Sequence, residues 1–281
     1  MPAPPFHFVE EHASGSSPCV SVRDARGRVW RVKWGAEVHT ETFAARMAWA
    51  AGYFVEVNYF VPSGTIDGAD GIQRARQCIA QDGSFSSARF ELEEPGVVKH
   101  FDEHSWAWND NPFVGTRELS GLKIMMMLVS NWDNKDVRDV ARGSNTAIFE
   151  YQMSASIREA RYLIIDWGAA MGAWGTHVLS RGRWDAQAFA AQSAEFILGL
   201  DGEDVLWGYK GQRTADAVLD ISRADVHWLY GYLGGISDEQ LAAGLRASGG
   251  NESEIAEFTR GLRVRIDQLK EIADGQGFSP A

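Results

Sequence analysis

Hydrophobic and polar residues alternate in short runs along the first part of the chain, and this pattern predicts β-strands. Residues 20–24 and 29–34 both alternate, and the residues between them favour a turn, so the two runs predict a β-hairpin. Residues 53–61 have the strongest strand pattern of the chain, and Pro62 is expected to end that strand. Residues 87–92 predict a further strand.

Helical spacing of apolar residues interrupts this β-rich part. The spacing over residues 43–50 predicts a helix that has Thr40 as a suitable N-cap and ends at Gly52. A short helix is also predicted over residues 71–79. From residue 93 to residue 115 turn-forming residues dominate, so this region is the expected boundary between a β-rich first part and a helical second part.

The second part of the chain is predicted to be mainly helical. Apolar residues recur at helical spacing over residues 116–129, and a last helix is predicted over residues 251–270. Two short runs, 146–151 and 161–165, predict a second hairpin between these helices. Beyond residue 175 the pattern is mostly helical.

Composition and charge narrow the class of protein. The chain has 281 residues, of which 45% are hydrophobic and 23% charged, as is usual for a globular protein. Its net charge of −11 argues against nucleic acid or an anionic membrane as the main partner. Cys19 and Cys78 provide neither a disulfide framework nor a metal-binding pair. No signal peptide and no membrane-spanning run is recognisable, so a cytoplasmic location is expected.

Candidate chemistry lies in a polar segment and in a short acidic turn. Residues 130–136 follow the predicted helix and include Asp133 and Lys135. The apolar run 163–165 then leads into Asp166 and a tight turn. Sites of phosphoryl transfer often have this construction, in which one carboxylate orients the nucleophile and another holds Mg²⁺.

The order of these elements resembles that of the protein-kinase-like superfamily, in a divergent, atypical branch of bacterial type. The motifs that carry the resemblance are Val32-x-Lys33 at the end of the first hairpin, the 130–136 loop and Asp-Trp-Gly at 166–168. By the order of its elements, the resemblance covers roughly residues 10–175.

The resemblance implies a two-lobed protein-kinase-like fold of the α+β class. A small, antiparallel, β-rich N-lobe with one helix would comprise residues 1–95, and a mainly helical C-lobe residues 116–281. Residues 96–115 would form the hinge between them. Within the hinge, Trp106 and Trp108 would either line a nucleotide pocket or pack in a surface loop.

The resemblance also implies how ATP would be held. Lys33 would neutralise the α- and β-phosphates, and a helix glutamate would hold this lysine in place. Glu41, in the first helical turn, suits this role best, and Glu37 is the alternative. No Gly-x-Gly-x-x-Gly motif is present, so Ser16 and Ser17 in the first loop are the candidates to cover the phosphates.

The family's catalytic roles fall on three further residues. Asp133 would orient the acceptor hydroxyl, and Lys135 would contact the γ-phosphate. Asp166 would bind Mg²⁺. The resemblance thus implies ATP and Mg²⁺ as cofactors.

One departure from the family pattern leaves the activity open. Arg138 stands where the family has a metal-binding Asn, and a guanidinium cannot bind Mg²⁺, so Asp139 or Asn145 would take that role. The first hypothesis is an ATP- and Mg²⁺-dependent phosphotransferase that acts on an unidentified hydroxyl. The second is a catalytically impaired, pseudokinase-like module that binds a nucleotide or a protein. The third is an interaction domain in which the tryptophans only pack.

The sequence does not identify the phosphate acceptor. A protein hydroxyl, a sugar, another small molecule and a lipid headgroup all suit the same loop chemistry. Arg181, Arg183 and Trp184 follow the acidic turn and would either contact an anionic acceptor or form a solvated basic turn.

Overall fold

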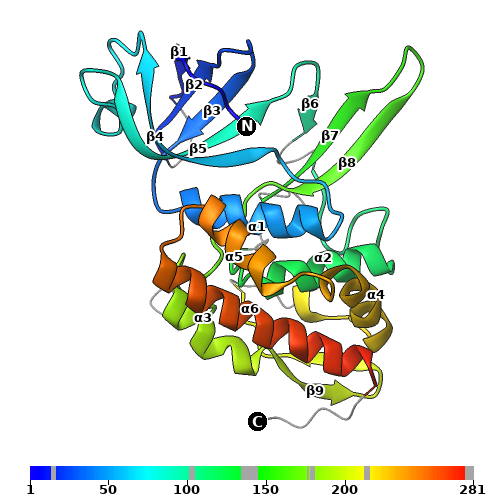
Figure 1. Ribbon diagram of the computed structural model, residues 1–281. Coiled ribbons are helices and arrows are strands. Elements are labelled where there is room, and N and C mark those ends of the chain that lie inside the picture. Colours follow the sequence, from blue (N-terminus) through cyan, green and yellow to red (C-terminus); the bar gives the residue numbers. More distant parts are fainter. Residues whose placement is uncertain are drawn as a thin grey trace.

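A computed structural model describes residues 1–13, 17–100, 105–133, 145–175, 177, 181–211 and 216–275. The fold is α+β, as predicted, with the barrel strands in its first part and most of its helices in its second. Figure 1 shows a β-barrel above a group of helices, with helix α1 (Val38–Ala50) lying between the two.

The first part forms a closed barrel in the strand order β1-β2-β3-β5-β4. Its strands are β1 (Phe6–Glu11), β2 (Cys19–Arg23), β3 (Val29–Lys33), β4 (Asn58–Asp67) and β5 (Ser84–Glu93). Strands β2 and β3 confirm the first predicted hairpin. Because side chains alternate between the two faces of a strand, Trp30 and Val32 of β3 and Phe90 of β5 fall in the buried barrel core. A parallel pairing of β1 with β4 closes the barrel.

Strand β4 differs from its sequence prediction at both ends. It begins at Asn58 rather than at residue 53, and it continues through Pro62. Near Pro62 the strand pairs with β5, while its pairing with β1 begins only at Ile66, so the proline lies at an open edge that needs no N–H donor. Gly64 allows close packing inside the barrel, because a Cβ there would lie 2.8 Å from the ring of Phe85.

The helix predicted over residues 71–79 is wrong in extent, since only a 3₁₀ turn, Ala75–Gln77, is present. The carboxylate of Glu11 accepts hydrogen bonds from the backbone N–H groups of Gln73 and Ala75, each at 2.8 Å. These bonds hold the segment against β1 instead of letting it form a longer helix.

The second part contains five α-helices and two small sheets within the described residues. The helices are α2 (Arg117–Leu128), α3 (Ala186–Gln192), α4 (Arg223–Leu233), α5 (Asp238–Ala247) and α6 (Glu252–Ala273). One sheet has the order β6-β7-β8, formed by β6 (Val98–His100), β7 (Thr146–Gln152) and β8 (Arg158–Ile164). Strands β7 and β8 confirm the second predicted hairpin.

The other sheet is a hairpin that the sequence analysis did not predict. Strands β9 (Ile197–Asp201) and β10 (Asp204–Trp207) pair in a region whose pattern is mostly helical. The turn between them contains Gly202 with a φ of +62°, a conformation that glycine adopts without strain. The strands are short, so their alternation gives little signal in the sequence.

Helices α2 and α6 supply much of the larger core. Residues 124–129, at the end of α2, are completely buried. Leu262, Ile266 and Leu269 of α6 are buried in the same cluster, which explains the apolar spacing of the last predicted helix. No helix in the described part of the chain is long and apolar enough to cross a membrane.

Candidate active site

Hydrogen bonds from α6 fix the position at which the polar loop begins after α2. Arg265 of α6 is fully buried and donates hydrogen bonds to the Leu128 carbonyl oxygen at 2.8 Å and to Ser130 Oγ at 2.7 Å. Ser130 has a φ of +58°, in the left-handed region that few non-glycine residues adopt. The backbone N–H of Asn131 donates to the Met126 carbonyl oxygen at 3.0 Å. The chain therefore reverses sharply before it reaches Asp133.

Three of the predicted site residues come together beyond this turn. Asp133, Asn145 and Asp166 line one small pocket, although they lie on three segments separated in the sequence. Asn145 Nδ2 donates a hydrogen bond to the Asp133 carbonyl oxygen. Asp166 Oδ1 accepts a hydrogen bond of 2.9 Å from the N–H of Gly168, which holds the acidic turn in shape. Two carboxylates and one amide thus share a pocket.

Asn131, for which the sequence suggests no role, lines the same pocket. Its Nδ2 donates to the Asp166 carbonyl oxygen at 2.9 Å, while its Oδ1 is buried and has no hydrogen-bond partner among the described residues. An unpaired buried polar atom costs about 1–3 kcal/mol. The pocket is small, about 10 Å³, and Asp133, Asn145 and Asp166 bring to it the types of oxygen ligand that a hard cation such as Mg²⁺ prefers.

The metal-binding capacity of the pocket depends on few protein ligands. In the described part of the chain, no group of three or more His, Cys, Asp or Glu residues is arranged to hold a metal ion. Mg²⁺ usually keeps several water ligands and binds one or two carboxylates together with substrate phosphates. Asp166 and Asn145 therefore fit an ion that a nucleotide would help to hold.

The surroundings of Asp133 favour its protonated form. Burial raises the pKa of Asp133, and the negative charges of Asp166 and Glu37 raise it further. Arg183 and Arg181 act in the opposite direction. A carboxylate with a raised pKa is better suited to accept a proton than an ordinary exposed Asp.

Glu41 of α1 is paired with Arg89 of β5, a residue that the sequence analysis did not single out. Arg89 Nη1 lies 2.8 Å from Glu41 Oε1, and its Nη2 lies 2.9 Å from Glu91 Oε2. All three side chains are buried. Glu41 Oε2 also accepts a hydrogen bond of 3.0 Å from the N–H of Trp167 in the acidic turn. Glu41 thus connects the barrel to the pocket that contains Asp166.

Lys33 lies beside this ion pair. It is the residue directly opposite Arg89 in the pairing of β3 with β5, and its charge acts on Glu41. Within the described residues Lys33 itself forms no ion pair, and the expected partner Glu41 binds Arg89 instead. The alternation of Arg89 and Glu91 with apolar neighbours along β5 is the sequence signal that marks this charged face.

Helix α1 also contacts the acidic turn through its first residues. The helix begins at Val38 with Glu37 as its N-cap, so the prediction of Thr40 as N-cap is wrong. The buried Thr40 hydroxyl instead lies 3.0 Å from two carbonyl oxygens, that of Gly168 and that of Glu37, and is the donor to both contacts. Glu37 packs against Gly168, where a Cβ would lie 2.7 Å from the Glu37 side chain.

The remaining predicted residues are placed only in part. Ser17 lies near the end of β3, since its Oγ would be 3.7 Å from a Cβ at Gly35. Ser16, Lys135 and Asp139 lie outside the described residues, as does Arg138.

The two hinge tryptophans pack on each other rather than in a surface loop. Trp106 and Trp108 are both buried, with their ring centroids 5.2 Å apart. Trp108 lines the small pocket beside Asp133. Trp106 lines a different pocket.

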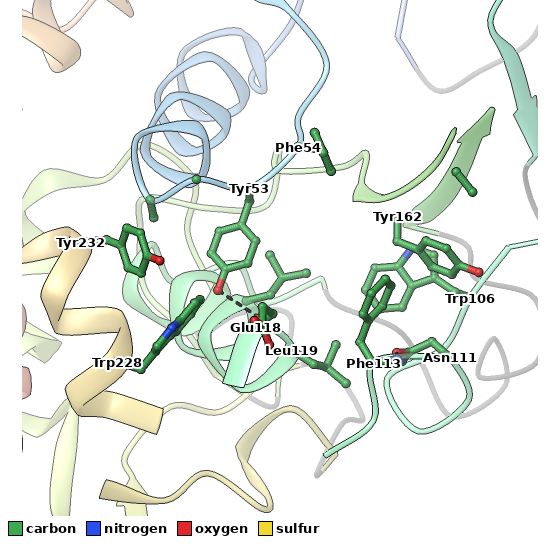
Figure 2. Close-up of a pocket in the computed structure, with 14 residues that line it drawn as sticks. Tyr53, Phe54, Trp106, Asn111, Phe113, Glu118, Leu119, Tyr162, Trp228 and Tyr232 are labelled. Carbon is green, nitrogen blue, oxygen red and sulfur yellow. Dashed lines mark hydrogen bonds between the residues drawn. The ribbon is translucent and has the colours of Figure 1, made fainter. Parts of the chain in front are cut away.

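That second pocket is apolar and has a volume of about 360 Å³. Figure 2 shows its aromatic walls, with Tyr53, Trp228 and Tyr232 on one side and Trp106, Phe113 and Tyr162 on the other. None of the candidate catalytic or metal-binding residues lines it. Its volume would admit a small molecule, but the titratable groups of the candidate active site lie elsewhere.

Comparison with known proteins relates the chain to others through its fold. No protein-family model matches the chain, and no curated protein sequence matches it. Among solved structures, the proinflammatory kinase CtkA of Helicobacter pylori matches with a TM-score of 0.56 and 12% identity, over 99% of this chain and all of that one (100%).

Two further solved structures match less well. The Golgi casein kinase with Mn and ADP bound gives a TM-score of 0.46 at 8% identity, covering 98% of this chain and 74% of that one. HipA of Shewanella oneidensis, in complex with HipB and operator DNA, gives a TM-score of 0.39 at 12% identity, covering 94% and 67%. The match to CtkA carries the conclusion, and this chain has a protein-kinase-like fold.

Proposed function

We propose that this protein is an ATP- and Mg²⁺-dependent phosphotransferase that acts on a hydroxyl group. The observation that carries the proposal is the convergence of Asp133, Asn145 and Asp166 on one pocket, in which Asn131 Oδ1 is buried without a partner among the described residues. The protein-kinase-like fold supports the same activity.

In this proposal Asp166 and Asn145 hold Mg²⁺, and Asn131 lines the same pocket. The bound ion would offset negative charge on the phosphates during transfer. Lys33 would bind the α- and β-phosphates from the barrel side. Ser17, with Ser16 beside it, would cover the phosphates, while Lys135 would contact the γ-phosphate and Asp139 remains the alternative metal ligand.

Asp133 would orient the acceptor hydroxyl and take its proton. The acceptor oxygen would form a bond to the γ-phosphorus as the bond from this phosphorus to the bridging oxygen breaks, so that ADP leaves with that electron pair. The raised pKa of Asp133 supports its role as the proton acceptor.

Arg89 would replace Lys33 as the ion-pair partner of Glu41. The ion pair between Arg89 and Glu41 ties β5 to α1, and Glu41 in turn holds the N–H of Trp167. Lys33 would then be available for the phosphates rather than for Glu41. This division of roles would preserve the link between the barrel and the metal-binding turn.

Thermal unfolding with and without ATP and Mg²⁺ tests the proposal. We expect the two ligands together to raise the Tm of the wild type, and Asp166→Ala to abolish the part of the shift that depends on the metal. Asp201→Asn, a change at the exposed last residue of β9, is the matched control and should shift like the wild type. No metal-dependent shift in the wild type would refute the proposal.

Turnover separates an active enzyme from a nucleotide-binding module. ATP consumption or autophosphorylation should disappear in Asp133→Asn while the ATP-dependent shift in Tm remains. If the wild type binds ATP and Mg²⁺ but shows the same background turnover as Asp133→Asn, it is a pseudokinase-like module.

A further inference from the structure

We infer that the acceptor carries an anionic group, a carboxylate or a phosphate, close to its hydroxyl, and that Arg181 and Arg183 bind this group. The inference rests on the proposed function, because it assigns the acceptor side of the same site. It concerns a basic turn, residues 181–183, which none of the proposed catalytic steps uses.

The basic turn is fixed to the residue that precedes Asp133. The guanidinium carbons of Arg181 and Arg183 lie 4.9 and 5.2 Å from the ring centroid of Trp132, within the range of cation–π contacts. Trp132 Nε1 donates a hydrogen bond of 2.9 Å to the Gly182 carbonyl oxygen, between the two arginines. Two guanidinium groups are therefore stacked on the ring of Trp132, the residue directly before the proposed base Asp133.

The position of the turn is set by the backbone as well. Gly182 N–H donates to the Ala173 carbonyl oxygen at 3.0 Å, and a Cβ at Gly172 would lie 2.4 Å from the Gly182 backbone. Trp184, in contrast, packs on Phe258 with ring centroids 4.8 Å apart, so it belongs to the core rather than to an acceptor site. These backbone contacts therefore hold the turn that carries Arg181 and Arg183 in place.

The charges around the turn favour an anionic ligand. Both guanidinium groups stack on Trp132, the residue directly before Asp133, so they lie close to the reacting end of the site. Arg183 Nη1 lies 3.2 Å from Glu37, and the two side chains are 34% and 36% exposed, within reach of a solute. A guanidinium has five donors, so Arg183 can bind a second oxyanion while it keeps Glu37.

This arrangement is unlike an ordinary solvated basic turn. The protein has a net charge of −11, which would on its own repel an acidic acceptor. Two guanidinium groups beside Asp133 provide local compensation, and their planar donors match carboxylate and phosphate oxygens. The stacking on Trp132 holds both groups before any ligand arrives, which lowers the entropy lost on binding.

The test is calorimetric binding of glycerol 3-phosphate, which carries a phosphate close to free hydroxyls, to the full chain in the presence of ADP and Mg²⁺. A peptide whose serine is flanked by glutamates is the second probe, and it distinguishes a peptide acceptor from a free small molecule. Glycerol and a peptide with glutamine in place of each glutamate are the neutral controls. We expect at least one anionic probe to bind the wild type at least tenfold more tightly than its neutral control.

The double variant Arg181→Gln/Arg183→Gln should lose at least tenfold in affinity for that probe, with unchanged affinity for ADP. Arg260→Gln, which removes an exposed arginine paired with Glu257 on α6, should bind like the wild type. The inference is overturned if neither anionic probe binds the wild type, if the double variant binds as tightly, or if the double variant loses ADP affinity instead.

Failure of the proposed function would be visible separately. The ATP- and Mg²⁺-dependent shift in Tm tests nucleotide binding without an acceptor. If that shift is absent while the anionic probe still binds through the two arginines, the phosphotransferase proposal fails and the anion site stands. If the shift is present and no anionic probe binds, only the inference about the acceptor fails.

Discussion

At the scale of single residues, the pKa values of the two carboxylates that share Arg89 are shifted in opposite directions. Burial raises the pKa of Glu41 to about 8 against the attraction of Arg89, and the nearby Asp166 adds to the rise. Burial also acts on Glu91, but there Arg89 and Lys33 outweigh it and lower the pKa. Glu91 therefore keeps the charge of Arg89 compensated when Glu41 takes up a proton.

The raised pKa of Glu41 predicts a pH dependence of stability. A carboxyl group with a pKa of 4.5 in the unfolded chain and about 8 in the folded chain binds more protons when folded between these values. Its stabilising contribution is complete below pH 4.5 and is lost as the pH rises towards 8. The loss is at most about 1.4 kcal/mol for each pH unit.

We expect Glu41→Gln to flatten the fall in the free energy of unfolding over this range. Urea unfolding at several pH values between 5 and 9, about one pH unit apart, measures how the free energy of unfolding depends on pH. Glu93→Gln is the control, because Glu93, at the end of β5, is half-exposed and has only long contacts, an ion pair with Arg31 at 3.8 Å and a hydrogen bond from Ser21 Oγ at 3.3 Å. Parallel curves for the wild type and Glu41→Gln would contradict the assignment.

At the scale of elements, helix α1 is the part that connects the barrel to the acidic turn. It reaches β5 through Glu41 and Arg89, and it reaches Gly168 through the hydroxyl of Thr40. Its other threonine at this end, Thr42, donates instead to the Val38 carbonyl oxygen within the helix at 2.7 Å. Both hydroxyls reach a carbonyl oxygen at the start of α1, and only that of Thr40 also reaches Gly168, so the two residues differ in the contact between elements.

We expect Thr40→Val to weaken the ATP- and Mg²⁺-dependent stabilisation more than Thr42→Val does. Loss of the bond to Gly168 should cost about 1–3 kcal/mol, because the carbonyl oxygen stays buried without that donor. The measurement is the shift in Tm produced by ATP with Mg²⁺ in each variant, compared with the Tm of each variant alone. Equal ligand-induced shifts would show that α1 does not support the turn.

At the scale of the whole molecule, Arg265 connects the last helix to the start of the candidate catalytic loop. Its guanidinium lies 3.7 Å from the ring centroid of Phe189 and donates to Ser193 Oγ at 3.0 Å, besides its bonds to Leu128 and Ser130. No carboxylate pairs with it in the described part of the chain. Burial accordingly lowers the pKa of Arg265 well below its usual range.

We expect Arg265→Met to reduce the free energy of unfolding by about 3 kcal/mol or more, because several buried acceptors lose their donor together. Arg260→Met on the same helix removes only an exposed ion pair with Glu257 and should cost less than about 1 kcal/mol. Urea unfolding at neutral pH compares the two. Similar losses in both variants would contradict a special role for Arg265.

The sequence alone predicted the elements whose pattern is local. The β2–β3 and β7–β8 hairpins and the last helix have clear alternation or helical spacing, and all three are present. The β9–β10 hairpin was missed because short strands carry a weak pattern. The predicted end of β4, at Pro62, was too early because a proline is tolerated at an open strand edge.

For the candidate site, the sequence by itself determined which chemical groups are available and in what order they follow along the chain. Asp133 and Asp166 stand out because acids after apolar runs are visible locally. Only the tertiary structure decided that Arg89 is the partner of Glu41, that Asn131 and Asn145 join Asp166 in one pocket, and that Arg181 and Arg183 stack on Trp132. Ion pairs and pockets depend on distances between segments far apart in sequence, and strand register and helix packing set those distances.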